Sequence, residues 1–235
     1  MLCQVVHGAV PPRFPSGTFF VIGPDAADPG ECGPVRHPLD GNGRIQRVQF
    51  RAGEVRISSA HVETVHRRNE RRAGRFLYRH TFGTGPQFGA DLKNAANTNF
   101  FIHGSRGFAL FEGSKPHEVD PDTLETKGES SLDGVVRAGM PMTTGCSPLD
   151  VLTGMGGEAL CAHPRRDPVT GHSVVNPQRS FFSVLSSANV SEQSIPYPSS
   201  SASSLERGVD VYTRACTCLS FVLAKHHSPT FWSGR

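Results

Sequence analysis

His163 stands directly before Pro164, and this pair is the best candidate for metal chemistry in the chain. The proline ring denies the preceding residue the α region, so His163 is expected in an extended conformation that restricts the direction of its imidazole. Thr170 and Gly171 then supply turn chemistry. A strand end of this kind can present one imidazole to a metal ion. A His-Pro pair is also typical of a turn or of a surface histidine with ordinary polar partners.

Two other polar segments could bind anions, and the sequence argues against both. The basic run at residues 66–75 could bind phosphate or RNA, but no aromatic residues are interleaved with it and the net charge is only +3. We therefore interpret it as a solvated loop between strands. The segment 41–43, Gly-Asn-Gly, could suggest a phosphate loop, but it enters a predicted strand, whereas such a loop precedes a helix N-terminus.

The composition limits the classes of protein that the chain can belong to. With 235 residues, 37% of them hydrophobic, it can bury a sizeable single core. The 24 Lys and Arg residues nearly balance 21 Asp and Glu residues, so nucleic acid is not an expected partner. The 25 glycines and 18 prolines fit many short strands joined by tight turns. The six cysteines show no pairing pattern of a secreted protein, and we interpret Cys216 and Cys218 as incidental.

The start of the chain bears on its compartment. Residues 1–20 lack the charged start and apolar run of a signal peptide. No stretch reaches the roughly 18 apolar residues that a membrane span needs. We expect a soluble protein in a reducing compartment, the cytoplasm or a plastid.

Short strand candidates separated by turn residues predict an all-β chain as far as about residue 130. A hairpin is expected from strands at 44–50 and 55–64, joined by a turn that contains Gly53. Residues 76–82 are another short candidate. No segment carries a capped, helix-period apolar stripe. The clearest unit is a set of three antiparallel strands, the material of a propeller blade or a sandwich, at residues 97–103, 108–112 and 117–119.

Beyond residue 130 the pattern becomes weaker. Residues 133–157 contain six glycines without alternation, which predicts a loop. Residues 172–235 hold 15 serines in 64 positions, and only 181–182 and 209–212 offer weak strand signals. We expect a β-domain over residues 9–171, followed over residues 172–235 by a divergent tail that is poorly ordered or misjoined.

Five short blocks precede the His163 segment in the chain. They are Gly17–Pro24, Leu39–Gly43, Lys93–Asn99, Ala109–Gly113 with Pro116 close behind, and Asp120–Thr126. Their order and spacing, together with the segment from Ala162 to Gly171, resemble the carotenoid cleavage oxygenase family. This family includes carotenoid and stilbene dioxygenases and a retinoid isomerase. The similarity covers roughly residues 9–171.

The resemblance implies a fold, a cofactor and a site. The fold is a seven-bladed β-propeller, of which residues 9–171 would form the first blades. The cofactor is Fe(2+), held at the propeller axis by four histidines from separate blades, and His163 matches the first of these. Glu112 matches a carboxylate that accepts a hydrogen bond from a ligand histidine and so fixes the orientation of its ring. Without the resemblance, Glu112 would be an ordinary solvated glutamate of a hairpin.

The resemblance also implies a reaction and its partners. Both atoms of O2 would be inserted across a C=C bond of a carotenoid, an apocarotenoid or a stilbene-like substrate, giving two carbonyl products. The partners are thus an apolar polyene or stilbenoid and O2, with no nucleic acid, and a peripheral membrane contact is a further expectation for the full-length protein.

The chain departs from the family pattern at the metal site. The family's second histidine belongs to a His-Asp pair followed by an apolar strand, and no His-Asp pair occurs in this sequence. Only His172, His226 and His227 follow His163, and we assign none of them as a ligand. Two hypotheses therefore stay open. The chain is a truncated form of a dioxygenase, inactive as given, or it is a catalytically inactive propeller fragment or binding-only domain.

Overall fold

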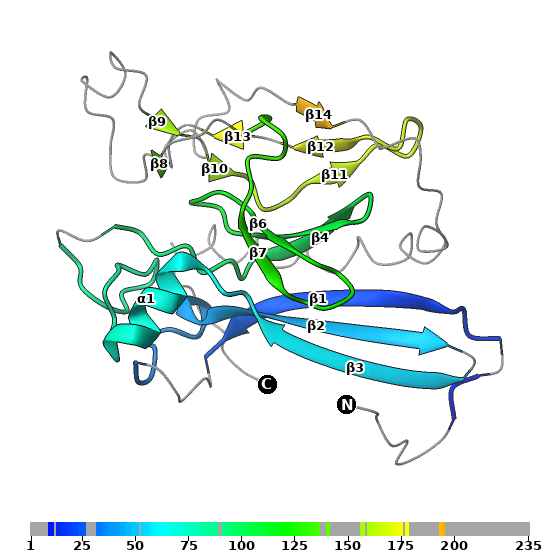
Figure 1. Ribbon diagram of the computed structural model, residues 1–235, viewed down its shortest axis with the longest axis horizontal. Helices are drawn as coiled ribbons and strands as arrows, with labels where there is room; N and C mark the ends of the chain where they lie inside the picture. The colour runs from blue at the N-terminus through cyan, green and yellow to red at the C-terminus, as the bar shows by residue number, and fades with distance from the viewer. Residues whose placement is uncertain are drawn as a thin grey trace, which may run out of the picture.

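The computed structural model describes residues 9–26 and 32–88, apart from 12 and 52, and then 91–136, 140–141, 156–157, 159–175, 177–178 and 193–195. These residues form small sheets arranged in layers, with one α-helix beside them (Figure 1). None of the described helical segments has the length and apolar character of a membrane-spanning helix.

The first layer is an antiparallel sheet of β1 (Gly17–Asp25), β2 (Asn42–Arg51) and β3 (Glu54–His61), in that order. A short 3₁₀-helix, η1 (Pro38–Asp40), precedes β2. The expected hairpin is confirmed as β2 and β3. Gly53 at its turn has a φ of +83°, a left-handed conformation that glycine adopts without steric cost. The structure also confirms that Gly-Asn-Gly leads into a strand and not into a helix.

The second layer is a four-stranded antiparallel sheet, which we call the blade. Its strands, in order, are β4 (Asn99–His103), β5 (Arg106–Leu110), β6 (His117–Val119) and β7 (Thr126–Glu129). The three predicted strands are confirmed, and β7 adds a fourth. The turn before β7 is held by Asp120, whose Oδ1 accepts the N–H groups of Asp122 and Thr123, both at 2.9 Å. A four-stranded antiparallel sheet is the unit from which a propeller is built.

The third layer consists of short strands. β8 (Met140–Pro141) pairs in parallel with β9 (Gly156–Gly157), β10 (Ala159–Leu160) pairs with β13 (Pro177–Gln178), and β12 (Ser173–Val175) lies between β11 (Arg165–Arg166) and β14 (Gln193–Ile195). The expected boundary at residue 171 falls inside this layer, because β12 and β14 continue the sheet beyond it. The weak strand signals at 181–182 and 209–212 lie outside the described residues, as does most of the predicted loop at 133–157.

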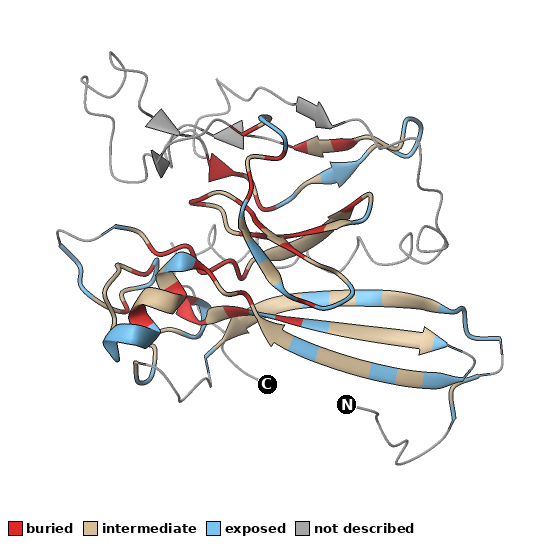
Figure 2. Cartoon of the chain, viewed as in Figure 1, coloured by how far each residue is buried: buried red, intermediate tan, exposed pale blue. Residues whose placement is uncertain are grey.

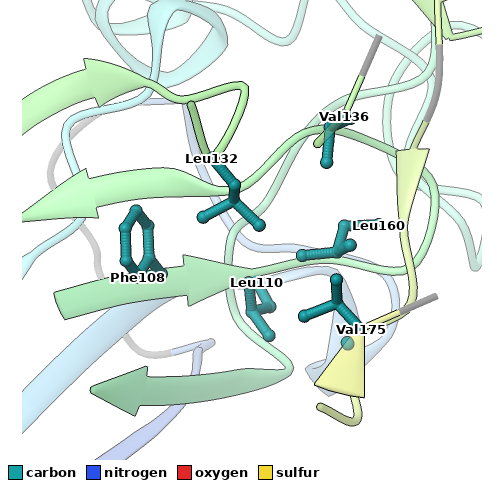
Figure 3. Close-up of a cluster of buried hydrophobic side chains, with 7 residues drawn as sticks. Phe108, Leu110, Leu132, Val136, Leu160 and Val175 are labelled. Atoms are coloured by element: carbon teal, nitrogen blue, oxygen red, sulfur yellow. The ribbon is translucent and has the colours of Figure 1, made fainter. Parts of the chain in front are cut away.

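The blade packs against another layer on each of its two faces. Because side chains alternate along a strand, β5 contributes to both contacts. Phe108 and Leu110 of β5 point toward the third layer, where they form one core cluster with Leu132, Val136, Leu160, Ala162 and Val175 (Figure 3). Ala109, between them, points the other way. It joins a second cluster with Ile45, Val62, Ala96, Val119 and Leu124, against the first layer. Buried residues accordingly gather between the layers (Figure 2).

One α-helix corrects the expectation of an all-β chain. α1 (Val65–Ala73) occupies most of the basic run that we predicted as a solvated loop. The Oγ1 of Thr64 caps its first turn, and Gly74 ends it in the left-handed conformation, with a φ of 62°. The helix lacks an apolar stripe because its buried positions are the charged residues Arg67 and Glu70. The prediction was wrong because it looked for hydrophobic periodicity alone.

The predicted strand at residues 76–82 is also wrong. Within it only Arg79 forms an isolated β-bridge. The following backbone turns around the buried carboxylate of Asp40, which accepts the N–H of Phe82 at 2.8 Å and the N–H of Thr84 at 3.1 Å. These backbone N–H groups thus donate to a side-chain carboxylate and not to the carbonyls of a neighbouring strand.

Beside α1 lies a buried ion pair, which we call the closed pair. The Nζ of Lys93 lies 2.6 Å from Oε2 of Glu70, and both side chains are at most 3% exposed. The other oxygen of Glu70 accepts the N–H groups of Leu77 at 3.1 Å and Tyr78 at 3.3 Å. Burial acts to raise the pKa of Glu70, but His80, Lys93 and the Leu77 N–H outweigh it and bring the pKa to about 2.

Candidate functional site

The structure brings the two predicted site residues into contact. Nε2 of His163 lies 3.1 Å from Oε1 of Glu112. Glu112 stands in the turn that follows β5, and His163 stands between β10 and β11. Their side chains are 31% and 41% exposed, so solvent reaches both. We call Glu112 and His163 the open pair.

Three contacts from the blade fix the segment that carries His163. Leu160 and Ala162 are fully buried in the core cluster between the blade and the third layer. The N–H of Leu160 donates to the carbonyl of Ser114 at 3.0 Å. The Nδ2 of Asn99 donates to the carbonyl of Ala162 at 2.9 Å. Because successive side chains of an extended chain point to opposite sides, burial of Ala162 leaves His163 directed away from the core.

Glu112 is positioned by the end of β5. Leu110, the last residue of that strand, is fully buried and anchors the turn. The turn is closed by the N–H of Ser114, which donates to the carbonyl of Phe111 at 3.2 Å. A side chain at Gly113 would meet Leu92 Cδ2 at 2.9 Å, so the close packing of this turn favours glycine there.

The two side chains of the open pair affect each other electrostatically. Contact with Glu112 raises the pKa of His163 above its usual value of 6.5, while partial burial acts in the opposite direction. Burial also raises the pKa of the neighbouring Cys161 thiol, and Glu112 adds to this effect. Cys161 is therefore a thiol rather than a reactive thiolate at neutral pH.

Among the described residues, the His163 imidazole is the group whose chemistry and surroundings fit a ferrous ion. An imidazole is a suitable ligand for Fe(2+), and one whose first nitrogen faces a carboxylate can offer its second nitrogen to the metal. Within the described residues, however, no group of three His, Cys, Asp or Glu side chains gathers to hold an ion. His172 lies in the β11–β12 hairpin and belongs to no such group, and His226 and His227 lie outside the described residues. The described residues alone therefore do not make up a complete set of metal ligands.

Our sequence reasoning missed Asn99 and Ser114, the two residues that hold the His163 segment. The signal for Asn99 was present, because the residue closes the Lys93–Asn99 block that carried the resemblance. Nothing in the sequence pattern indicated that the Ser114 carbonyl faces Leu160.

A comparison with family models identifies the group to which this chain belongs. The family described as RPE65, retinal pigment epithelial membrane protein, matches residues 1–227. The chain is a member of the carotenoid cleavage oxygenase family. The match extends well beyond residue 171, where we expected the similarity to end.

Curated relatives agree with this assignment. The chain is 34% identical over 190 residues to the apocarotenoid-15,15'-oxygenase of Synechocystis sp., covering 77% of the chain and 35% of that protein. It is 37% identical over 199 residues to the chloroplastic carotenoid cleavage dioxygenase 7 of Oryza sativa, covering 72% of the chain and 32% of that protein. The chain thus spans about a third of the length of these relatives.

Solved structures show that the fold is also that of the family. A cobalt-substituted Synechocystis apocarotenoid oxygenase superposes with a TM-score of 0.59 at 32% identity, over 75% of this chain and 35% of that one. A chimera of that enzyme with the retinal pigment epithelial protein superposes with a TM-score of 0.60 at 30% identity, over 75% and 36%.

Proposed function

We propose that this chain supplies part of the iron site of a non-haem Fe(2+) dioxygenase that cleaves a C=C bond of a carotenoid, apocarotenoid or stilbene-like substrate. The contact between Glu112 and His163 carries the proposal, because it joins a metal-binding imidazole to a carboxylate at 3.1 Å in a solvent-accessible place. The assignment also implies that the remaining blades and ligands of a seven-bladed propeller lie beyond the described residues.

Each residue of the open pair has a defined task under this proposal. His163 would donate one neutral nitrogen to Fe(2+), which when bound supplies the activation of O2. Glu112 would accept the N–H of a ligand histidine, which selects one tautomer of the ring and increases its basicity. The buried residues Leu160 and Ala162 hold the backbone of the His163 segment in place. Less ordering of this segment would then be needed when the metal binds.

The names of the relatives support the substrate class. They describe an apocarotenoid oxygenase, a carotenoid cleavage dioxygenase and, in Botryotinia fuckeliana, a resveratrol cleavage oxygenase. An apolar polyene or stilbenoid and O2 are the corresponding proposed partners. The chloroplastic rice relative supports a plastid as one of the two compartments that we proposed, the cytoplasm being the other.

A catalytically inactive fragment or a binding-only domain is the second candidate function. The observation that favours it is the incomplete ligand set, since one imidazole among the described residues is a weak and exchangeable contact for a ferrous ion. The two candidates differ in whether the natural protein oxidises its ligand.

Product analysis tests the proposal. The longest natural polypeptide that contains residues 1–235 is supplied with Fe(2+), ¹⁸O2 and either an apocarotenal or resveratrol. We expect a pair of aldehydes that both carry ¹⁸O. His163→Ala is expected to abolish their formation, and His172→Ala is the matched control that retains it, because His172 lies on the neighbouring hairpin outside the open pair. Binding of the polyene without any ¹⁸O product would overturn the proposal in favour of the second candidate.

Iron analysis of the 235-residue chain alone adds an independent check. We expect far less than one iron per chain, because the described residues supply a single imidazole at the site. Stoichiometric, tightly held iron in this chain would contradict the incomplete ligand set.

A peripheral membrane contact is a further part of the proposal. Phe88 is 94% exposed, and Phe82 and Leu39 are 41% and 37% exposed. Phe82 and Leu39 belong to one surface, because Phe82 stacks on His37 and its N–H is bonded to Asp40. Sedimentation with phosphatidylcholine vesicles, compared between wild type and Phe88→Ser, tests this point. Equal sedimentation of the two proteins would contradict it.

A further inference from the structure

We infer that Asn99 is a positioning residue, which sets the direction of His163 through the peptide bond that joins Ala162 to His163. The relation of this residue to a metal depends on the proposed function, whereas its effect on the imidazole does not. Asn99 is the first residue of β4, and in the blade it pairs with Leu110 of β5. β4 thus provides Asn99, which holds the backbone next to His163. The neighbouring strand β5 leads into Glu112, whose carboxylate contacts the His163 ring.

The amide of Asn99 is locked in one orientation. Its Oδ1 accepts the N–H of Phe100 at 2.8 Å, and its Nδ2 donates to the carbonyl of Ala162 at 2.9 Å. Rotation of the amide by half a turn would place the Nδ2 donor group against the Phe100 N–H, also a donor, and the acceptor Oδ1 against the Ala162 carbonyl oxygen, also an acceptor. The local bond to Phe100 therefore commits the donor side of Asn99 to the His163 segment.

This single hydrogen bond reaches His163 because a peptide unit is planar. The carbonyl of Ala162 and the N–H of His163 belong to the same plane, so fixing the carbonyl fixes that N–H as well. On the other side of His163, the ring of Pro164 excludes the α region. The α-carbon of His163 is thus held between two restrained peptide units, which limits the directions in which its side chain can leave the backbone.

Asn97 provides a matched comparison on the same block. It is 7% exposed, and its Nδ2 donates to the carbonyls of Leu39 at 3.0 Å and Gly41 at 2.8 Å. These bonds hold the segment before β2 and do not involve residues 160–163. A variant at Asn97 removes amide–carbonyl bonds of the same kind, whose acceptors lie outside residues 160–163.

The first experiment measures His163 in the metal-free 235-residue chain. Histidine labelled with ¹³C in the ring is incorporated into wild type, Asn99→Asp and Asn97→Asp, and the His163 signal is assigned with His163→Gln. Aspartate keeps the shape of asparagine but removes the donor. We expect the His163 signal to shift and broaden in Asn99→Asp and to stay at its wild-type position in Asn97→Asp, although both variants lower the melting temperature.

The second experiment measures Co²⁺ affinity in the longest natural polypeptide, using the absorption of the bound ion. Loss of a residue that orients a ligand typically lowers metal affinity roughly 10- to 100-fold. We expect a loss of that size for Asn99→Asp and wild-type affinity for Asn97→Asp. A His163 signal in Asn99→Asp that coincides with that of wild type would overturn the inference, whatever the metal does. A shifted signal combined with unchanged Co²⁺ affinity in His163→Ala would leave Asn99 as a positioning residue and refute the proposed function.

Discussion

Two glutamates of this protein each face a basic side chain, and their surroundings are opposite. Glu70 of the closed pair is 3% exposed, lies 2.6 Å from the Lys93 ammonium and also accepts two backbone N–H groups. Glu112 of the open pair is 31% exposed and lies 3.1 Å from the imidazole of His163, which is itself 41% exposed.

The difference shows how the same residue type can serve structure or chemistry. Inside the protein, a charge without partners is very costly, so Glu70 must be saturated by protein groups to stay ionised. A saturated carboxylate has no capacity left for a ligand. Glu112 stays partly hydrated, and its basic partner is an imidazole, which can bind a metal when neutral. The closed pair is therefore suited to a structural role, and the open pair has the features that the proposed function requires.

Breaking the closed pair is expected to give the largest effect. Lys93→Met leaves the Glu70 carboxylate buried without its cation, and removal of one partner of a buried pair costs about 3–5 kcal/mol. Urea unfolding monitored by circular dichroism measures this change in the free energy of unfolding. The double variant Lys93→Met/Glu70→Leu removes the stranded charge as well and is expected to be clearly more stable than Lys93→Met. A single variant as stable as wild type would contradict the assignment.

Acid is expected to have the next largest effect, and it acts mainly through His117, a buried histidine of β6. Burial lowers the pKa of His117 to about 4, and His66 and Arg68 add to the effect. The unfolded chain binds the proton near the usual value of 6.5, so the free energy of unfolding falls as the pH drops from about 6.5 to about 4, by an amount of the order of 3 kcal/mol. Glu70, with its pKa lowered to about 2, adds a further loss between about pH 4.5 and about 2.

Urea unfolding at a series of pH values measures this slope. His117→Gln, which has no proton to take up in this range, is expected to flatten the profile between about pH 6.5 and about 4. A variant with the same slope as wild type would contradict the account of His117.

Close packing between the start of β2 and the Ala96 segment gives an intermediate effect. A Cβ on Gly43 would lie 1.9 Å from the carbonyl oxygen of Ala96, a backbone atom that cannot move aside cheaply. Gly43→Ala is therefore expected to lower the free energy of unfolding by about 1–3 kcal/mol or more. Gly23→Ala is the matched control, because a Cβ there meets nothing within 4 Å. Equal stability of the two variants in urea would show that the β2 start and the Ala96 segment are not packed as described.

Breaking the open pair is expected to give the smallest effect on stability. Glu112→Gln removes an ion pair whose members are about a third exposed or more, and such pairs contribute roughly 0–1 kcal/mol. The pKa of His163, raised by Glu112, is expected to fall toward 6.5. The stability that the pair contributes is present below about pH 6.5 and is lost as the pH rises through the folded pKa, so the variant differs from wild type mainly in acid.

Titration of the His163 ring by NMR measures this shift. Glu54→Gln, at the exposed start of β3, is the control that leaves the pKa of His163 unchanged. An unaltered His163 titration in Glu112→Gln would contradict the contact.

The predictability of the fold depended on whether apolar side chains mark the buried face. β2, β3 and the first three strands of the blade were all predicted, β3 from its alternation of apolar and polar residues and the others from short runs bounded by turn residues. α1 was missed because the residues it buries, Arg67 and Glu70, are charged. The caps Thr64 and Gly74 were readable, but a cap without an apolar stripe did not suffice to predict a helix.

The candidate site depended on information of another kind. The resemblance to the family indicated His163 and Glu112, and the proline after His163 indicated a restrained imidazole. The contact between the two residues could not be derived from the pattern, because it depends on how the 160–163 segment crosses the blade. That crossing is set by the hydrogen bonds of Ala162 with Asn99 and of Leu160 with the Ser114 carbonyl. Asn99 stood in a block that carried the resemblance, but nothing in the sequence indicated that either residue bonds to the 160–163 segment.

Iron content tests most directly the proposal that the open pair binds metal and that the buried His117 does not. The longest natural polypeptide containing these residues is reconstituted with Fe(2+) as wild type, His163→Ala and His117→Gln, and the iron retained after gel filtration is measured at neutral pH. We predict stoichiometric iron in wild type and in His117→Gln, and loss of most of the iron in His163→Ala. Equal iron in His163→Ala and wild type would contradict the account.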